Sequence, residues 1–177
     1  MLTRLIRRSG ATVITTCSPR NFEFVQSLGA DLALDYNSPT VVSDIKDFTR
    51  NTLSHVLDCF GGSAGERICY DSFGPSGGKY SSIVFSAETP RPEIDRSMVM
   101  AYESYGQYFR KWDMDFPAKP DLYAFTAKFW TLVEPLLANG SLKPHPTREG
   151  KGFEGILDGL DDMRAQRYSG EKLVYTL

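Results

Sequence analysis

The side chains best suited to binding chemistry lie where an apolar run gives way to a helical pattern. The run "ATVITTC" at 11–17 is followed by Ser18, Pro19, Arg20 and Asn21, and this junction holds no Asp or Glu. A hydroxyl beside a planar guanidinium suits a phosphate group, which accepts hydrogen bonds from both. In a dinucleotide-binding fold this junction meets the adenosine ribose, where a carboxylate selects NAD and an arginine or hydroxyl accepts the 2′-phosphate of NADP. The junction therefore predicts NADPH (NADP) as the cofactor.

A purely structural role for the same residues stays open. Ser18 and Pro19 also fit a helix N-cap followed by a first helical proline, with Arg20 solvated. Tyr36, at the end of the next apolar run, favours the cofactor interpretation because its ring is placed to stack on adenine beside the same phosphate. Half-buried packing is the alternative role for Tyr36.

The elements that would position this junction alternate regularly. The basic start of the chain also fits a transit peptide, but Leu2, Leu5 and Ile6 share one helix face, which predicts a helix that ends at Gly10. From there, apolar runs predict strands and 3.6-residue periods predict helices. The strands are expected at 11–17, 31–36, 55–60 and 77–85, and the helices at 20–30, 38–51 and 63–73. This order predicts an α/β fold, a Rossmann-like parallel sheet with helices on both faces.

The second half of the chain departs from this alternation. Two loops are predicted at 87–97 and 110–120, with a strand and an aromatic-rich irregular segment between them at 98–109. Two helices are expected at 121–140, with a stripe of Phe125, Phe129, Val133 and Leu136, and at 153–166. "EKLVYTL" predicts a final strand.

Composition narrows the classes of partner. The 177 residues carry a net charge of -2, so no extended cationic surface favours nucleic acid or an anionic membrane. No run approaches the roughly 18 apolar residues of a membrane helix. The odd number of cysteines indicates reduced thiols, and the isolated His55 and His145 indicate no metal site. We therefore expect a soluble, cytoplasmic protein that binds a small molecule.

Asp58 is a charged residue inside an apolar predicted strand. A buried carboxylate needs partners, so we expect Asp58 to accept backbone or hydroxyl hydrogen bonds at the cofactor edge rather than to act as a base. Cys17 and Cys59, in similar runs, are expected to be buried apolar packing.

Longer stretches carry a family resemblance. "GATVITTCSPRNFEFVQSLGADLALDY", "LDCFGG", "GGKYSSI" and "SGEKLVYTL" resemble the cofactor half of the zinc-free, quinone reductase-like branch of the medium-chain dehydrogenase/reductase superfamily. Within that branch, "TCSPRNF" and "YESYGQ" most resemble the fungal trans-acting enoyl reductases that serve polyketide synthases. The resemblance implies an NADPH-dependent oxidoreductase of enoyl reductase type, which acts on an acyl thioester with a polyketide synthase as partner.

The same resemblance implies roles for individual residues. The adenosine 2′-phosphate end is held by Ser18, Pro19, Arg20, Asn21 and Tyr36. Ile83 and Val84 flank the nicotinamide, and Val174 and Tyr175 close over the cofactor. The acyl pocket is lined by Tyr102, Glu103, Ser104, Tyr105 and Gly106. No catalytic acid or base is evident.

Two departures from the family pattern matter. The superfamily's first strand, its glycine-rich pyrophosphate turn and its N-terminal GroES-like substrate domain have no counterpart here, and "FGGSAG" (60–65) and "GPSGG" (74–78) are more typical of turns. We therefore expect one partial NADP-binding domain over 1–177, with C-terminal helices and a final strand, derived from a longer reductase. In the order 3-2-1-4-5-6 the missing strand lies between 11–17 and 55–60, so these two strands would face a gap.

Two other functions stay open beside the enoyl reductase. The chain is alternatively a non-catalytic nucleotide-binding or interaction fragment, because its sheet edges would be exposed. A quinone or general enone reductase differs from the first hypothesis only in the substrate pocket.

Overall fold

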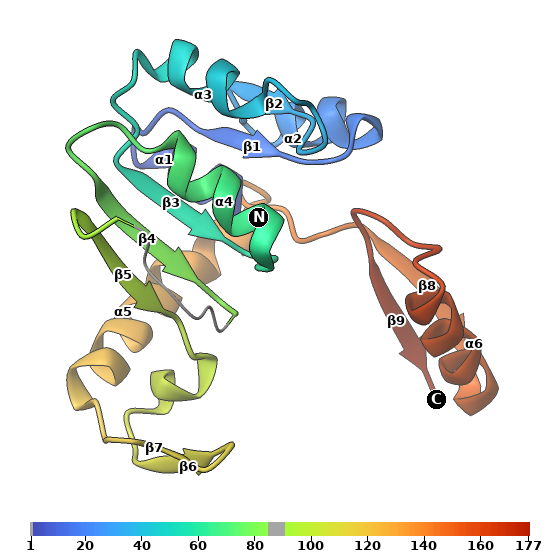
Figure 1. The fold of residues 1–177 in the computed structure, drawn as a ribbon. Helices are drawn as coiled ribbons and strands as arrows, with labels where there is room; N and C mark the ends of the chain where they lie inside the picture. The colour runs from blue at the N-terminus through green and yellow to red at the C-terminus, as the bar shows by residue number, and fades with distance from the viewer. Residues whose placement is uncertain (1, 85–90) are drawn as a thin grey trace.

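The computed structural model describes residues 2–84 and 91–177 (Figure 1). In chain order the elements are α1 (Leu2–Arg8), β1 (Ile14–Thr16), the 3-10 turn η1 (Pro19–Asn21), α2 (Phe22–Ser27), β2 (Leu32–Leu34), α3 (Val41–Thr49), β3 (His55–Asp58), α4 (Ser63–Ser72), β4 (Gly78–Ser82), β5 (Ile94–Met98), the 3-10 turn η2 (Ala101–Tyr105), β6 (Phe109–Lys111), β7 (Met114–Phe116), α5 (Pro120–Ala138), β8 (Thr147–Lys151), α6 (Gly152–Arg164) and β9 (Lys172–Thr176). None of the helices in the described ranges is long and apolar enough to cross a membrane.

The first two strands form a small parallel sheet. β1 pairs with β2 from Ile14 opposite Leu32 to Thr16 opposite Leu34. Asp31 ties this sheet to α1, because its Oδ2 accepts hydrogen bonds from Val13 N (2.8 Å) and from Arg7 Nη1 (3.2 Å). The predicted helix end at Gly10 is confirmed: its φ is 89°, a left-handed conformation that glycine adopts without strain.

A second parallel sheet, in the order β3-β4-β5, carries the core. Tyr80 in the central strand β4 is fully buried, and its ring stacks on that of Tyr70 in α4 at 4.8 Å between centroids. Phe73 and Ile94 complete this cluster. α4 is therefore fixed to the sheet by aromatic packing, which sets the path of the turns at the strand ends.

The two sheets are not joined by strand pairing in the described residues. β1 is paired only with β2, and β3 only with β4, so one edge of each lacks a strand partner. The predicted α/β architecture with parallel strands is thus confirmed, and among the described residues no strand pairs with both β1 and β3. The chain does not close the gap by pairing β1 directly with β3.

Three predictions for the second half were wrong. Most of β5 lies in the predicted loop 87–97, of which 87–90 fall outside the described residues, and η2 lies in the segment 98–109, where a strand followed by irregular chain was expected. β5 is an edge strand that buries only Ile94 and exposes charged side chains, so it lacks an apolar run. The predicted loop at 110–120 contains most of the hairpin β6–β7.

The hairpin and β8 were missed for related reasons. Trp112 and Asp113 form the turn of the hairpin with φ of 52° and 59°, a two-residue turn with left-handed residues that usually includes glycine. Phe109 and Phe116 pair across the strands with rings 4.6 Å apart, which stabilises this register. β8 has the polar sequence TREGK and depends on its parallel pairing with β9.

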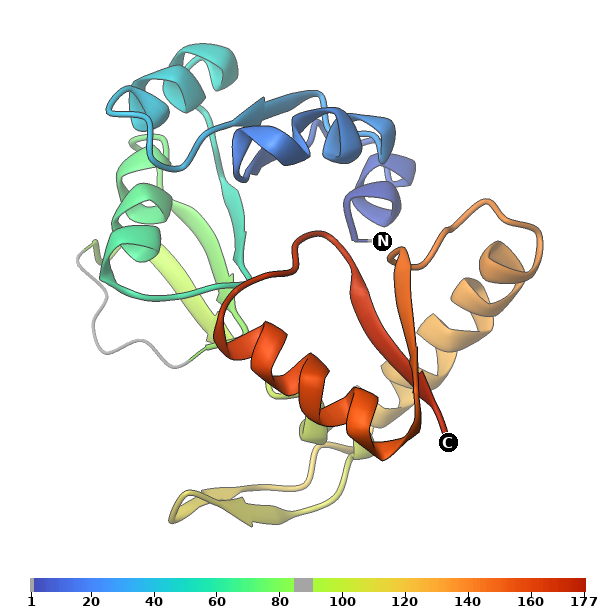
Figure 2. The ribbon, with the colours of Figure 1, turned by 90° about the vertical axis from the view of Figure 1, so that its right-hand side faces the viewer.

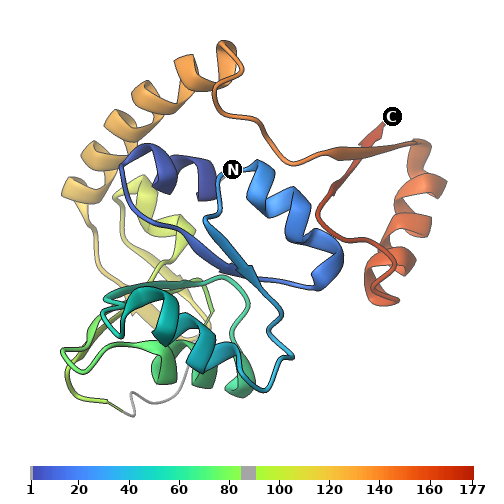
Figure 3. The same ribbon diagram turned by 90° about the horizontal axis from the view of Figure 1, so that it is seen from above.

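β8, α6 and β9 form a unit of their own, which lies to one side in Figures 1 and 3 and faces the viewer in Figure 2. The Tyr175 ring from β9 packs on Gly150 of β8 and on Gly155 and Gly159 of α6. Arg148 pairs with Asp162 at 3.1 Å and with Glu171 at 3.3 Å. Contacts to α2 and its preceding turn come from Asn21 Nδ2, which donates to Ser169 Oγ at 3.0 Å, and from the rings of Phe24 and His145.

α5 exposes part of the predicted apolar stripe. Val133 is 1% exposed, whereas Phe125 and Phe129 are 63% and 36% exposed. The periodicity therefore predicted the helix correctly but not its burial, because no described element covers the face that carries these two rings.

Candidate functional site

The junction after β1 brings together three of the predicted cofactor residues. Ser18 Oγ lies 3.3 Å from Tyr36 Oη, within hydrogen-bond distance. Arg20 is exposed in η1, and no carboxylate among the described residues forms an ion pair with it. The junction thus presents two hydroxyls beside a guanidinium without an ion-pair partner, which is a suitable donor set for a phosphate.

Ser18 and Pro19 fit the alternative role, a helix N-cap followed by a first helical proline, only in part. Ser18 occupies the N-cap position of η1 and Pro19 its first position, but the Ser18 side chain makes no capping hydrogen bond. Its hydroxyl points to Tyr36 instead. Burial, and then the charge of Asp35, raise the pKa of the Cys17 thiol, so one carboxylate also lies in the neighbourhood of this junction.

Asp58 ends β3 and is 6% exposed. Its Oδ1 accepts hydrogen bonds from Phe60 N (2.9 Å) and Gly61 N (2.8 Å), and its Oδ2 accepts one from Tyr80 Oη (2.9 Å). The predicted role of Asp58 as a hydrogen-bond acceptor is confirmed. By contrast, Cys59 was expected to be buried and is exposed, because the strand ends before it.

Ile83 and Val84 follow β4 at the same carboxyl-terminal edge of the sheet. The register places Asp58 opposite Ser82, so the residues that follow the two strands are neighbours. Ser82 Oγ donates to Val84 O at 2.8 Å and accepts from Val84 N at 3.0 Å, which fixes the turn. Gly61 admits Val84, since a Cβ at Gly61 would lie 3.0 Å from Val84 Cβ. Ile83 is 53% exposed and offers an apolar surface.

The two glycine-rich segments lie at opposite ends of their strands. "FGGSAG" follows β3 and leads into α4, with Gly62 at the N-cap. "GPSGG" precedes β4 and is a turn, because a Cβ on Gly77 or Gly78 would overlap the carbonyl oxygen of Glu93 or Ser54. Only "FGGSAG" lies at the edge where open α/β sheets bind ligands.

η2 and the hairpin enclose a hollow of about 370 Å³. Of the residues that the resemblance places at the acyl pocket, Tyr102 and Tyr105 line this hollow, whereas Glu103, Ser104 and Gly106 do not. Glu103 is 8% exposed and forms an ion pair with Lys119, and Ser104 Oγ donates to Ala101 O. Gly106 ends η2 with a φ of 71° and packs against Tyr123.

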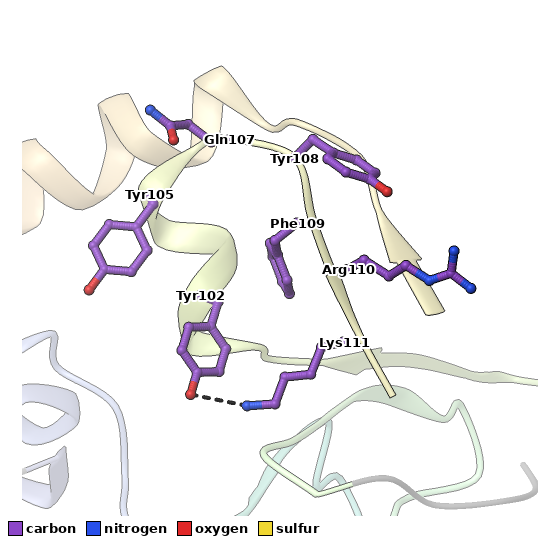
Figure 4. A pocket seen from close by; sticks show the side chains of 7 residues that line it. All are labelled: Tyr102, Tyr105, Gln107, Tyr108, Phe109, Arg110 and Lys111. Atoms are coloured by element: carbon purple, nitrogen blue, oxygen red, sulfur yellow. Dashed lines mark hydrogen bonds between the residues drawn. The ribbon is translucent and has the colours of Figure 1, made fainter. Parts of the chain in front are cut away.

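Five lining residues of this hollow were missed, namely Gln107, Tyr108, Phe109, Arg110 and Lys111. Figure 4 shows Phe109 and Lys111 on the same side of the chain as Tyr102, and Tyr108 and Arg110 on the other. Lys111 Nζ donates a hydrogen bond of 3.1 Å to Tyr102 Oη and lies 4.1 Å from the centre of its ring. The alternation of side chains in "YFRKWDMDF" was the available signal for a strand here.

The remaining predicted residues make other contacts. Asn21 donates to Ser169, and Tyr175 packs on the glycines of α6 and β8, while Val174 is 42% exposed. The structure does not bring Val174 or Tyr175 to the junction at Ser18. Their place over a cofactor stays a prediction.

The fold defines an α/β protein of the Rossmann-like class, in which ligands bind at the carboxyl ends of the strands. The comparisons with known proteins agree with this class. The chain matches half of the JamJ enoyl reductase (TM-score 0.72, 14% identity, 98% of this chain), a likeness that shows the fold. No family model matches the chain.

The resemblance predicted from the sequence is confirmed by curated relatives. The chain is 38% identical to the trans-enoyl reductase eqxC of Fusarium heterosporum over 98% of its own length and 51% of that protein. It is 42% identical to the dual trans-enoyl reductase/FAD-dependent monooxygenase tazHJ of Aspergillus terreus, over 89% of this chain and 23% of that protein. Apart from that dual protein, the curated relatives are about twice as long as the part that the chain matches.

Proposed function

We propose that the chain forms the cofactor-binding part of an NADPH-dependent enoyl reductase that acts on an α,β-unsaturated thioester in polyketide biosynthesis. The observation that carries this proposal is the similarity to trans-enoyl reductases over 98% of the chain. The chain would be one partial NADP-binding domain, with the C-terminal helices and final strand, and would act in the cytoplasm on a thioester delivered by a polyketide synthase.

The residues present fit two parts of the cofactor. Ser18, Arg20 and Tyr36 would hold the adenosine 2′-phosphate, because the hydroxyls of Ser18 and Tyr36 lie 3.3 Å apart, Arg20 follows two residues after Ser18, and no carboxylate among the described residues is paired with Arg20. Ile83 and Val84 would support the nicotinamide through apolar contact. A bound nicotinamide cofactor supplies the hydride. A first strand with a glycine-rich turn ahead of α1 is not among the described residues, so the fit covers the two ends of the cofactor and not its pyrophosphate.

The substrate would bind in the hollow between η2 and the hairpin. Val99 N donates to Ser82 O at 2.7 Å, which places the start of this segment beside the residue that precedes Ile83. Tyr102 follows three residues later, at most about 11 Å along the chain. The tyrosine walls of the hollow would therefore lie within reach of the nicotinamide end.

The test is NADPH oxidation by the purified chain with crotonyl thioester as substrate. Oxidation with the thioester, and slower oxidation with a quinone or with NADH in place of NADPH, supports the proposal. Preference for the quinone favours the quinone reductase alternative. NADPH binding, seen as a change in its fluorescence, without turnover of either substrate would overturn the proposed activity of this chain.

A second candidate function is an interaction fragment that binds nucleotide without catalysis. It is favoured by one observation, the unpaired edges of β1 and β3. Backbone donors and acceptors on such edges pair readily with a strand of another chain. Binding without turnover, together with capture of a second polypeptide on these edges, would support this candidate instead.

A further inference from the structure

The hollow between η2 and the hairpin contains a tyrosine whose hydroxyl is held by an ammonium group. Lys111 Nζ donates to Tyr102 Oη at 3.1 Å and also lies over the Tyr102 ring, 4.1 Å from its centre. The two residues come from different elements, since Tyr102 belongs to η2 and Lys111 ends β6. Figure 4 shows both side chains directed toward one another.

Lys111 is positioned by its neighbours rather than by an acid. Its Nζ lies 4.7 Å from the centre of the Trp112 ring, and among the described residues no carboxylate forms an ion pair with it. Phe109, on the same side of β6, contacts Tyr102 with ring centroids 5.8 Å apart. The ammonium is thus fixed between two aromatic faces, with the Tyr102 oxygen as its hydrogen-bond acceptor.

This arrangement leaves the phenolic proton of Tyr102 available. A hydroxyl that accepts a hydrogen bond from a cation is polarised and becomes a stronger donor through its own O–H. Tyr102 is 46% exposed and lines the hollow, so a ligand there can reach its oxygen. Tyr123 in α5 is 58% exposed and is not among the residues that line the hollow, so it serves as the control.

We propose that Tyr102 Oη donates a hydrogen bond to the carbonyl oxygen of a bound thioester and that Lys111 is the positioning residue that orients and polarises this hydroxyl. The ligand class follows from the proposed function. When hydride adds to the β-carbon, the electrons of the double bond shift toward the α-carbon and the carbonyl oxygen, which gains negative charge. Tyr102 keeps its proton and stabilises that charge through the hydrogen bond, as oxyanion donors do.

The test measures binding, independently of hydride transfer. The probes are S-butyryl-N-acetylcysteamine, a saturated thioester, and S-butyl-N-acetylcysteamine, the thioether without a carbonyl. Quenching of Trp112 fluorescence in a Trp130→Phe background reports the affinity of each. Tyr102→Phe should weaken the thioester about tenfold, which corresponds to about 1.4 kcal/mol, and leave the thioether unchanged. Tyr123→Phe should change neither.

A spectroscopic readout separates this role from a structural one. The infrared stretch of the thioester carbonyl should move to lower frequency in the wild-type complex and return toward its value in water in Tyr102→Phe. Lys111→Met keeps the packed stem but removes the charge, so the shift should shrink, and Lys111→Arg should restore it. If Tyr102→Phe fails to fold, this second pair of variants decides the question.

Three results would overturn the inference: equal affinity of the wild type for thioester and thioether, unchanged thioester affinity in Tyr102→Phe, or a carbonyl stretch that does not respond to Lys111→Met. Tyr102-dependent thioester binding without any NADPH oxidation would instead refute the proposed function and leave this inference standing.

Discussion

Tyr80 and Asp58 form a buried hydrogen bond in which Tyr80 Oη donates to Asp58 Oδ2 at 2.9 Å. The other carboxylate oxygen accepts from the backbone of Phe60 and Gly61. A core side chain of β4 and the turn that follows β3 therefore share one carboxylate. Through it, the packing of Tyr80 under α4 fixes the strand end that borders Val84.

Replacement of Asp58 should destabilise the chain more than replacement of its tyrosine partner. Asp58→Ala leaves three donors without their acceptor, and each such group costs about 1–3 kcal/mol when buried. We expect the free energy of unfolding in urea to fall by about 2–4 kcal/mol, against about 1 kcal/mol for Tyr80→Phe. Equal losses for the two variants would show that the backbone hydrogen bonds of Phe60 and Gly61 contribute nothing.

Stability should fall as the solution becomes alkaline. Burial raises the pKa of Tyr80 above its usual range, and the hydrogen bond to Asp58 and the charge of that carboxylate add to the shift. Burial also raises the pKa of Cys69 to about 12, with a further contribution from the charges of Asp58 and Glu66. The unfolded chain releases these protons first, from about pH 8.5 for the thiol and about pH 10 for the phenol, whereas the folded chain retains them. The contribution of these two groups to the free energy of unfolding is therefore complete below the pKa values of the unfolded chain. It is lost as the pH rises from there toward the raised pKa values of the folded chain.

The measurement is the free energy of unfolding in urea at a series of pH values from neutral to alkaline. The double variant Tyr80→Phe, Cys69→Ala lacks both groups, so its alkaline decline should be shallower than that of the wild type. Parallel curves for the two proteins would contradict the raised pKa values.

The sequence predicted the elements of the first half because each strand there is apolar and each helix begins or ends at a turn residue. Ser18, Arg20 and Tyr36 were proposed from the residue types at two strand ends, and the structure places the hydroxyls of Ser18 and Tyr36 3.3 Å apart. The hydrogen-bonded role of Asp58 was predicted from a charge inside an apolar run. Lys111 was not found, since its contact with Tyr102 depends on a hairpin whose turn residues, Trp112 and Asp113, carry no glycine signal. Burial of α5 was also overestimated, because periodicity gives the apolar face but not the element that covers it.

Arg20 and Ser18 should determine the preference for a 2′-phosphate. Replacing both with Ala removes the guanidinium and one hydroxyl of the junction. One charge-assisted hydrogen bond contributes roughly 1.5–3 kcal/mol, so the loss of even one such bond should lower the affinity for 2′,5′-ADP about 10- to 150-fold. Calorimetry with 5′-AMP, which lacks the 2′-phosphate, should show little change. Arg67→Ala, which removes a similarly exposed arginine from α4, serves as the control, and an equal effect of that variant would contradict the assignment.

Gly159 and Gly155 should respond differently to the same substitution. A Cβ on Gly159 would overlap the Tyr175 hydroxyl, whereas one on Gly155 would lie 3.5 Å from the Tyr175 ring, an ordinary contact. Gly155→Ala should therefore be neutral or stabilising by up to about 1 kcal/mol, because alanine favours the helix. Gly159→Ala should destabilise by about 1–3 kcal/mol.

The readout is hydrogen exchange of the amides in α6 and β9, which form one unit with β8. Tyr175→Phe removes the oxygen nearest to the added methyl group, so it should restore part of the protection lost in Gly159→Ala. Equal protection in the two glycine variants would mean that the ring does not insert between β8 and α6.

The unpaired edges of β1 and β3 should exchange their amide hydrogens faster than the strand between two neighbours. β4 is paired with β3 on one side and β5 on the other, whereas β1 and β3 each have one partner in the described chain. Amides without a strand partner exchange through openings that cost less free energy. β5 serves as the reference for a solvated edge, because it is an edge strand with exposed charges. We expect the slowest exchange in β4 and, for the amides of β1 and β3 that face the gap, rates like those of the outer amides of β5. If both strands were as protected as β4, they would be paired across the gap in solution, either with each other or with a second chain. A series of protein concentrations would distinguish these two arrangements.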